Sequence, residues 1–433
     1  MFGRRLFIVS VVLLMAAACT SASESGAVPT PNESPPTGTS AAIGTSSAGS
    51  PLFSGSRATL QPAQDGSFLV RAAYPKTASK CKHAHRGTLQ ARYPGTLSVR
   101  SDADGTMSIM MTLPFERYLE GIAEVPPSWP AAALEAQVIA ARSYALAHIG
   151  WTGQQGEALQ TPICSTSDCQ VYGGIPVPPT PGIRRWDAAV QRTQGQVLLY
   201  GGRPADTVYF STSNGHTYGN DLVFGSSPLP YLRPVVERDD GASITSHWNV
   251  ALPFTDLATF LRAGGLWPDG ARISSVRRTG SNVRVAGAGT SRSIDVGAFR
   301  DAVNAWASCL MPARYPTGGL PTTIPSDWYD VASGPHGATV VGRGWGHGVG
   351  MVQWGAYGKA KRGWSADRIL AFYYGGLKPT RYPEPGLIHV VVASGLQTLT
   401  VKPSTSGATI NGEPLRRETL HVSGAAGVVT VGT

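Results

Sequence analysis

The acidic residue Glu124 has the surroundings that a catalytic acid needs. It lies in the stretch EGIAEVPPSWP, where Ile122 and Trp129 are apolar neighbours and Pro126 and Pro127 hold the chain extended instead of helical. A carboxyl group in such surroundings is partly desolvated, and desolvation raises its pKa toward the range useful for a general acid. The alternative is an ordinary solvated glutamate in a surface loop, where most glutamates are found.

A buried helix is predicted directly after this acid, over residues 130–150. Proline fits the first turn of a helix, the alanine-rich run that follows has high helix propensity, and the final glycine suits a C-terminal cap. The segment is apolar nearly all round, which is typical of a helix in a protein interior. Glu135 and Arg142 share one stripe of this helix and Gln137 and Tyr144 another, so we expect polar partners for them, such as an ion pair between Glu135 and Arg142.

A second group of polar residues follows two predicted strands, residues 197–200 and 207–210. The second strand leads into the polar loop STSNGH, which contains Ser211, Ser213 and His216. Small hydroxyl groups and a histidine at the end of a strand are typical of a binding site. Serine, asparagine and glycine are also ordinary turn residues, so a plain turn is the alternative.

A third group lies in the run GRGWGHGVGMVQW, where glycine occupies alternate positions from 342 to 350. Dinucleotide and phosphate loops need a different glycine spacing, so a nucleotide site is excluded. The glycines permit close approach of the backbone to a ligand or to another backbone segment, with Trp345 and His347 projecting from the ribbon. Gln353 begins a predicted helix. Aromatic and polar groups in this combination can hold sugar rings, and the alternative is core packing.

The cysteines favour disulfides. Beyond Cys19 the chain has Cys81, Cys164, Cys169 and Cys309, and in an exported protein four cysteines are expected to pair. Cys164 and Cys169 are close enough for a local bridge, which leaves Cys81 with Cys309. A zinc site is the alternative, because CKHAH places two histidines beside Cys81.

The start of the chain suggests export, and the net charge of the whole chain suggests an anionic neighbour. The start, MFGRRLFIVSVVLLMAAACT, is typical of a secretory signal peptide, and the three alanines before Cys19 resemble a bacterial lipoprotein box. This favours a lipid anchor on Cys19, and simple secretion is the alternative. Residues 20–55 are rich in serine, threonine, proline and glycine, which predicts a disordered tether. The net charge of +9 over 433 residues indicates a wall polymer, a membrane surface or nucleic acid as neighbour. No basic run carries interleaved aromatic residues, which argues against nucleic acid.

The remaining chain predicts an α+β fold with a β-rich core. Short alternating runs in residues 53–112 indicate strands, and residues 248–313 resemble an inserted α/β unit in which most residues can be assigned to packing. The resulting division is a signal peptide over 1–19, a tether over 20–55, a catalytic domain over 56–380 and a β-rich C-terminal extension over 381–433.

Three separated motifs resemble the family of the stage II sporulation protein D and the amidase enhancers of bacterial cell walls. They are LPFERYLEGIAEVPPSWPAAALEAQVIAARSYAL, FSTSNGHTYGN and GRGWGHGVGMVQWGAYGKAKRG, with CQVYGG between the first two. The resemblance covers roughly residues 105–376. This chain departs from the usual pattern at Val125, Asn214 and Val352, and none of these changes removes an ionisable group.

The resemblance implies a lytic transglycosylase that acts on the glycan strands of peptidoglycan. Glu124 matches the family's acid, which would first protonate the glycosidic oxygen and then act as a base. Arg142, His216, His347 and Gln353 would line the groove, and the mechanism requires no metal and no cofactor. A non-catalytic activator of an N-acetylmuramoyl-L-alanine amidase is the alternative that the family's other name suggests.

Overall fold

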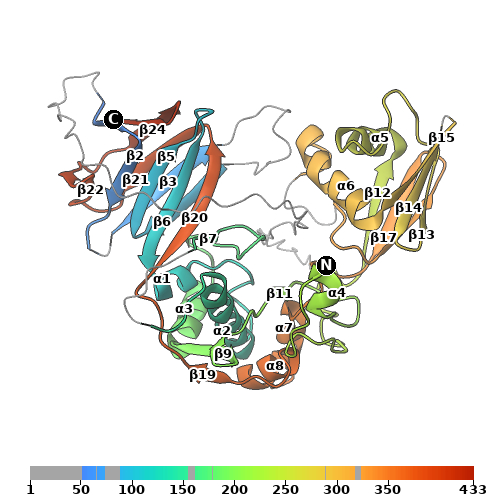
Figure 1. Ribbon diagram of the computed structural model, residues 1–433, viewed down its shortest axis with the longest axis horizontal. Helices are drawn as coiled ribbons and strands as arrows, with labels where there is room; N and C mark the ends of the chain where they lie inside the picture. The colour runs from blue at the N-terminus through green and yellow to red at the C-terminus, as the bar shows by residue number, and fades with distance from the viewer. Residues whose placement is uncertain are drawn as a thin grey trace, which may run out of the picture.

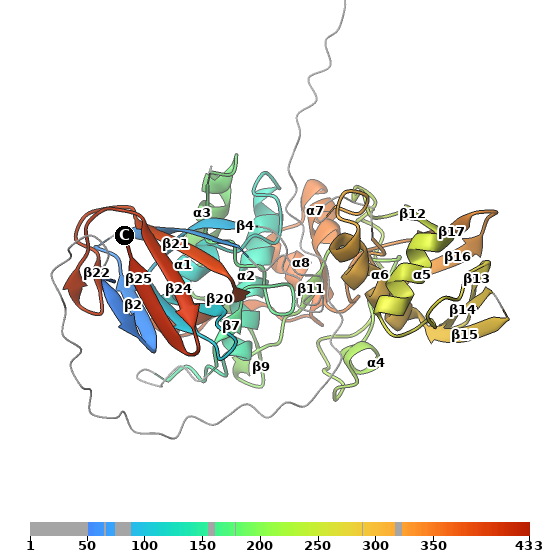
Figure 2. The ribbon, with the colours of Figure 1, turned by 90° about the horizontal axis from the view of Figure 1, so that it is seen from above.

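The computed structural model contains three parts: a β sandwich of two sheets, a helical part, and the inserted α/β unit. The helical part lies between the other two (Figures 1 and 2). The described residues are 51–64, 66–73, 88–154, 161–177, 179–287, 289–316 and 323–433. Within these residues, no helix is both long and apolar enough to cross a membrane. The predicted signal peptide, Cys19, most of the tether, Cys81 and its neighbouring histidines lie outside the described residues.

The β part consists of two seven-stranded sheets. The first has the strand order β1 (Phe53–Gly55), β25 (Val428–Gly432), β24 (Leu420–Ala425), β21 (Thr398–Pro403), β3 (Ser67–Ala73), β4 (Thr88–Pro94) and β8 (Ile175–Pro176). The second has the order β23 (Glu413–Pro414), β22 (Thr409–Ile410), β2 (Arg57–Gln61), β5 (Thr96–Ser101), β6 (Met107–Pro114), β20 (Leu387–Leu396) and β7 (Ile163–Cys164). Alternate residues of the strands are buried in a shared core, as Leu97 and Val99 are in β5.

The two ends of the chain build these sheets together, which corrects two predicted boundaries. β21 pairs with β3 on one side and β24 on the other, and β20 pairs with β6, so residues 381–433 are not a separate extension. The predicted tether also ran too far, because Phe53 pairs with Val431 in β1 and β25. Pairing between strands far apart in sequence leaves no local signal, so composition alone misplaced both limits.

The helical part is organised around α2 (Ala131–His148), which confirms the predicted helix. Small side chains such as Ala136, Ala140 and Ala141 are fully buried and let neighbouring elements approach closely. Those neighbours are α1 (Phe115–Glu120), α3 (Ile183–Arg192), α7 (Gln353–Lys361), α8 (Ala366–Tyr373) and the small sheet of β10 (Arg203–Pro204), β9 (Gln196–Tyr200) and β19 (Pro379–Arg381). Because α2 is covered on several sides, its nearly uniform apolar surface is satisfied.

The inserted unit has its own hydrophobic core and extends beyond the predicted limit of residue 313. It comprises β12 (Trp248–Pro253), α5 (Phe254–Ala263), β13 (Ser275–Thr279), β14 (Asn282–Gly287), β15 (Thr290–Asp295), α6 (Val296–Leu310), β16 (Tyr329–Ser333) and β17 (Gly337–Gly342). β17 pairs with both β12 and β16, so the unit closes only at residue 342. With mixed helices and many strands, the molecule confirms the predicted α+β class with a β-rich core.

Candidate active site

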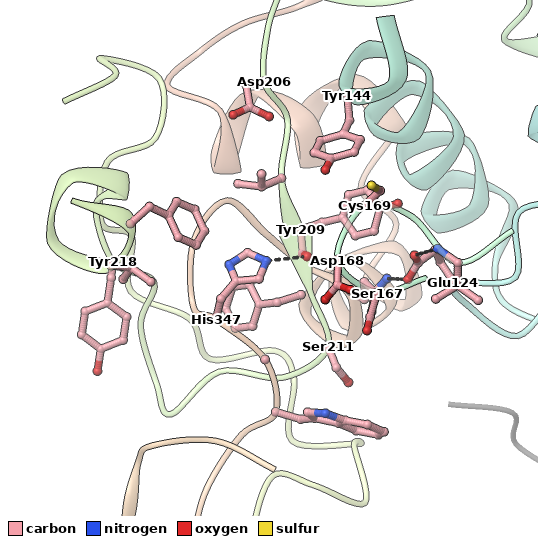
Figure 3. A pocket seen from close by; sticks show the side chains of 18 of the residues that line it. Glu124, Tyr144, Ser167, Asp168, Cys169, Asp206, Tyr209, Ser211, Tyr218 and His347 are labelled. Atoms are coloured by element: carbon pink, nitrogen blue, oxygen red, sulfur yellow. Dashed lines mark hydrogen bonds between the residues drawn. The ribbon is translucent and has the colours of Figure 1, made fainter. Parts of the chain in front are cut away.

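A cleft of about 1120 Å³ lies where the helical part meets the inserted unit (Figure 3). This volume exceeds the usual range of a small-molecule site, about 300 to 1,000 Å³, so the cleft can hold a ligand larger than one sugar ring. Its walls come from α2, from the loops after α1 and β7, from the segment around β11 (Tyr209–Phe210) and from the inserted unit. Ionisable and aromatic side chains of the wall are Glu124, Tyr144, His148, Asp168, Asp206, Tyr209, Phe210, Tyr218, Phe224, Arg300, Asp327, Trp328, Trp345 and His347.

Glu124 lies in the cleft wall, half-buried, in the loop between α1 and α2. Its Oε1 accepts a hydrogen bond of 2.7 Å from the backbone N–H of Val171, and Gln353 Nε2 lies 3.4 Å from its Oε2. Burial raises the pKa of Glu124 to about 6, although the hydrogen bonds from Val171, Gln353 and Tyr209 favour the charged form and oppose that rise. At neutral pH a protonated fraction of about a tenth therefore remains, which suits a group that must both give and take a proton.

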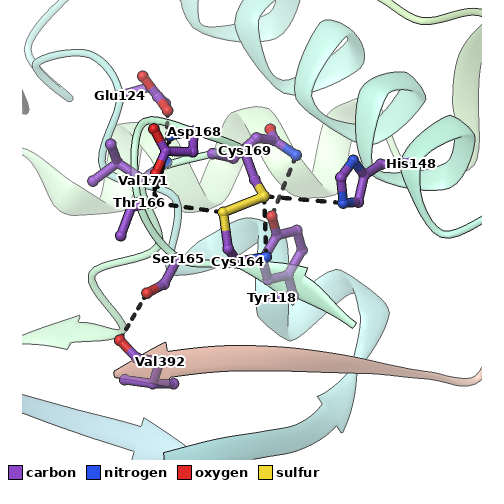
Figure 4. The surroundings of a disulfide bond; sticks show 11 residues. Tyr118, Glu124, His148, Cys164, Ser165, Thr166, Asp168, Cys169, Val171 and Val392 are labelled. Atoms are coloured by element: carbon purple, nitrogen blue, oxygen red, sulfur yellow. Dashed lines mark hydrogen bonds between the residues drawn. A yellow bond between two sulfur atoms is a disulfide. The ribbon is translucent and has the colours of Figure 1, made fainter. Parts of the chain in front are cut away.

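The loop that holds Glu124 is fixed by a disulfide (Figure 4). Cys164 and Cys169 are bonded to each other, with their Cα atoms 5.5 Å apart, and the Ser165 hydroxyl donates to the Val392 carbonyl in β20. Two residues beyond this bridge, Val171 takes part in two bonds with the segment around Glu124. Its carbonyl accepts from the N–H of Ala123 at 2.9 Å while its N–H donates to the Glu124 carboxylate. The loop closed by the disulfide thus connects β20 of the two-sheet β part to Glu124 and holds the acid in position. The predicted second pair, Cys81 with Cys309, stays a prediction.

A chain of buried polar groups continues from Glu124 into the interior. The Tyr209 hydroxyl donates to Gln170 Oε1 at 2.8 Å and also contacts the Glu124 carboxyl. Gln170 is fully buried and its Nε2 lies 3.2 Å from both the Tyr118 hydroxyl and the Ala141 carbonyl, so its amide is held in one orientation. The single hydroxyl proton of Tyr209 has two acceptors, Gln170 and ionised Glu124. When Glu124 is protonated it can in turn donate to the Tyr209 oxygen, so this chain accommodates both charge states.

The glycine run brings the backbone close to β11. Gly346 and Gly350 have φ values of 109° and 76°, which side-chain-bearing residues rarely adopt, and a Cβ on Gly350 would lie 2.0 Å from the Val208 carbonyl oxygen. This approach allows β11 to pair in parallel with β18 (Met351–Val352). The close backbone contact that we predicted for these glycines is thus a contact with another strand.

His347 lines the cleft, but both of its ring nitrogens are engaged by the protein. Nε2 lies 2.9 Å from the Tyr209 carbonyl oxygen and Nδ1 lies 3.1 Å from the N–H of Val349, so Nε2 donates and Nδ1 accepts. Burial lowers the pKa of His347 to about 4, which keeps the ring neutral. His347 therefore positions Tyr209 and offers a ligand only its ring face, beside Phe224 at a centroid distance of 5.3 Å.

Several predicted residues come together here. Those that line the cleft are Glu124, Tyr144, Ser211, Trp345, His347 and Gln353. They come from loops and helices separated by more than 200 residues of sequence, and Figure 3 shows Glu124, Tyr144, Ser211 and His347 around one space.

The predictions for Arg142 were wrong. Its side chain has 0% exposure and is paired with Glu116 at 3.0 Å and with Glu384 at 2.8 Å, not with Glu135. Glu135 instead pairs with Arg192 at 2.7 Å. A spacing of seven places two residues on one stripe, but the long side chains turned to partners on other elements. Arg142 joins α1, α2 and the segment before β20, and it does not line the cleft.

Three further predicted binding residues lie outside the cleft. The Ser213 hydroxyl is buried and donates to Asp240 at 2.7 Å, which fixes the polar loop. His216 is exposed and packs against the ring of Tyr218 at 4.5 Å. Gln137 is buried, and among the described residues its amide atoms have no hydrogen-bond partner. None of the three lines the cleft.

Five residues that line the cleft had no predicted role in the site: Asp168, Asp206, Tyr209, Arg300 and Trp328. Tyr209 lies in a strand that was predicted, next to the selected serine loop, so its position could have suggested a role. Arg300 belongs to α6, in the unit that was assigned to packing, and it lines the cleft although it is only 2% exposed. No local signal marks a helix residue that reaches a distant site, so only the tertiary structure identifies it.

Comparison with known proteins places this site in a family context. Residues 103–200, which include Glu124 and the disulfide loop, match a family model described as stage II sporulation protein. An uncharacterized protein of Brachyspira hyodysenteriae is 30% identical over 286 residues, which are 64% of this chain and 69% of that protein. Stage II sporulation protein D of Bacillus subtilis is 27% identical over 317 residues, 70% of this chain and 84% of that protein. The amidase enhancer of Bacillus subtilis is 30% identical over 300 residues, 60% of this chain but 39% of the enhancer's own length.

Proposed function

The chain belongs to the stage II sporulation protein family, and we propose that it is a peptidoglycan-remodelling enzyme, a lytic transglycosylase. Its substrate is the glycan strand, cleaved between N-acetylmuramic acid and N-acetylglucosamine. The observation that carries the proposal is the half-buried carboxyl of Glu124, with a pKa of about 6, in the wall of a large cleft. The names of the relatives, amidase enhancer and stage II sporulation protein D, support a role at the cell wall.

One carboxyl group suffices for this reaction because the sugar supplies its own nucleophile. Protonated Glu124 gives its proton to the glycosidic oxygen, the bond from C1 to that oxygen breaks, and the N-acetylglucosamine end leaves as an alcohol. The Glu124 carboxylate then takes the proton of the C6 hydroxyl as O6 bonds to C1. The muramic acid end becomes a 1,6-anhydro sugar, no water is consumed, and Glu124 regains its proton. A glycoside hydrolase would instead use two carboxyl groups and water.

The aromatic wall of the cleft supports a carbohydrate as ligand. The rings of Tyr218 and Trp328 are stacked with centroids 5.6 Å apart, and both line the cleft together with Trp345. Such rings bind the apolar faces of sugars, while Ser211 and Tyr144 offer hydroxyl groups for the rim. Trp328 follows α6 of the inserted unit, so that unit contributes one wall of the proposed glycan site.

The second candidate is a non-catalytic activator of a cell-wall amidase. The name of the Bacillus subtilis relative favours it, since an activator could bind glycan in the same cleft without cleaving it. The Glu124 environment favours the enzyme, because binding alone gives no reason to keep a carboxyl half-buried with a raised pKa.

Cleavage of purified glycan strands separates the two candidates. The protein is incubated with intact and with peptide-stripped strands in water enriched in oxygen-18, and the new ends are analysed by mass spectrometry. A lytic transglycosylase gives 1,6-anhydromuramic ends without oxygen-18, whereas a hydrolase gives reducing ends that carry the label. If no new ends form on either substrate while a cell-wall amidase is accelerated, the enzyme proposal is wrong and the activator is supported.

We further propose that the protein is exported and held at the outer face of the membrane by a lipid on Cys19. The apolar run that ends in three alanines before Cys19 and the long tether after it support this. A flexible tether would let the catalytic part reach the wall. Replacing Cys19 with serine should release the protein into the soluble fraction, and unchanged membrane retention would contradict the anchor.

A further inference from the structure

The inserted unit carries a concentrated positive charge that the proposed reaction does not use. Residues 271–294 contain five arginines and no acidic residue. They form the three antiparallel strands β13, β14 and β15, at the end of the molecule farthest from the sandwich (Figures 1 and 2). Of these arginines, Arg277, Arg284 and Arg292 have exposed side chains within the strands.

Strand register brings two of these arginines directly opposite each other. Arg277 is the Cα partner of Arg284, while their neighbours Val276, Val283 and Val285 are buried in the core of the unit. Both arginines therefore lie on the outward face of the sheet. Like charges directly opposite on neighbouring strands destabilise a sheet, so this pair carries a local energetic cost while no anion is bound.

Among the described residues, none of the ion pairs involves Arg277, Arg284 or Arg292. Arg284 Nε donates to the Ser291 hydroxyl at 3.2 Å. Asp295, at the end of β15, accepts from the backbone N–H of Gly297 as the cap of α6. Arg292 is the Cα partner of the buried Val285 and so belongs to the other face of the sheet. On the outward face, the guanidinium groups of Arg277 and Arg284 are thus available to an anion from solution.

We propose that this basic face of β13, β14 and β15 binds a linear phosphodiester polymer. Guanidinium groups bind phosphate oxygens through two parallel hydrogen bonds, and neighbouring arginines can engage successive phosphates of a chain. The neighbouring hydroxyls of Ser291 and Ser293, both exposed, can donate to the same oxygens. The site goes beyond the proposed cleavage reaction, because it lies on a different sheet from the cleft and uses none of the residues that line it.

The composition of the face favours such a polymer over a bilayer or a nucleic acid. None of the large exposed hydrophobic residues of the described chain lies within residues 271–295, so the face has no side chain that could insert among lipids. The same absence removes the aromatic rings on which unpaired bases stack. A flat, hydroxyl-lined basic face without apolar anchors is complementary to a flexible polyanion.

The test compares two arginine pairs of the same geometry. The double variant Arg277→Gln and Arg284→Gln is measured for binding to poly(glycerol phosphate) by calorimetry at 50 and 200 mM salt. We expect the dissociation constant to rise by about ten- to a hundredfold at low salt and its salt dependence to become shallower, since charged contacts are lost. The matched control replaces Arg57 and Arg100, which are also opposite each other, but in the sandwich and with Asp102 at 4.0 Å from Arg100.

The outcomes are distinct. Loss of binding in the Arg277 and Arg284 variant, with binding within about twofold of the parent in the control, supports the site. Equal loss in both variants means that only net charge matters and overturns it, as does an absence of binding by the parent. Tighter binding of the parent to phosphatidylglycerol vesicles or to single-stranded DNA than to the polymer overturns the choice of ligand. Thermal melting checks the fold, and glycan cleavage should be unchanged because neither pair lines the cleft.

Discussion

Replacing Glu124 with glutamine changes both turnover and stability, and the two effects have opposite signs. The amide keeps the size of the side chain, and its oxygen can still accept the hydrogen bond from the N–H of Val171. It cannot donate the proton that the glycosidic oxygen needs. We therefore expect cleavage to fall by about 10² to 10⁴, while binding of glycan strands is retained.

The same substitution should stabilise the folded protein at alkaline pH. The pKa of Glu124 is raised from 4.5 to about 6 by burial. That difference corresponds to about 2 kcal/mol, by which the ionised carboxyl disfavours the folded state. Below pH 4.5 both the folded and the unfolded chain hold the proton, so the penalty is absent. It develops as the pH rises from 4.5 to 6 and persists in full above pH 6, where glutamine removes it.

Two measurements check this reasoning. Glycan cleavage per folded molecule is compared between the parent and the variant, and thermal midpoints are compared at pH 4 and pH 8. The thermal midpoint of the variant should be higher than that of the parent at pH 8 and equal to it at pH 4. Glu135→Gln is the control, because Glu135 forms a partly exposed pair with Arg192 and should change stability by less than about 1 kcal/mol. Parental turnover in the Glu124 variant, or a lower midpoint at pH 8, would refute the role or the environment assigned to this carboxyl.

Three further changes probe the surroundings of the acid. Tyr209→Phe removes a hydroxyl that favours ionised Glu124, so the pKa of Glu124 should rise further. The fall of kcat/KM on the alkaline side, expected near pH 6, should then move to higher pH. If it does not move, the hydroxyl does not act on the acid. Arg142→Ala leaves two partly buried carboxyl groups without their cation and should destabilise the protein by about 3 kcal/mol, seen by thermal melting, without the loss of strand binding expected of a ligand contact. Replacing Cys164 and Cys169 with serine opens a short loop worth about 2 kcal/mol and should lower both the midpoint and cleavage, and unchanged cleavage would show that the bridge does not position the acid.

Local sequence signals predicted the helices well. The alanine-rich run gave α2 within two residues, and the helix predicted to begin at Gln353 forms from that residue as α7. The boundaries between the parts of the chain were predicted less well. β20 joins the sheet that contains β2, and β21 joins the sheet that contains β1 and β3, and nothing in their own composition indicates these partners.

The site divides in the same way. The apolar and proline-rich neighbours of Glu124 are a property of the sequence, and they predicted a carboxyl with a raised pKa. For Arg142, Ser213 and His216, polarity within an apolar or turn-rich segment was also visible, but the segment did not reveal whether the partner would be a ligand or the protein.

By itself the sequence determined which residues have unusual local surroundings: an acid among prolines, a helix of small apolar residues and glycines at alternate positions. Such features arise from propensity, sterics and desolvation over a few residues, and these act within a short stretch of chain. Only the tertiary structure decided that Val171, Tyr209 and Gln353 meet at Glu124, and that Trp328 lines the same cleft. Contacts between distant residues depend on how whole sheets and helices pack, and that packing is fixed by the complete set of buried surfaces, which no single segment contains.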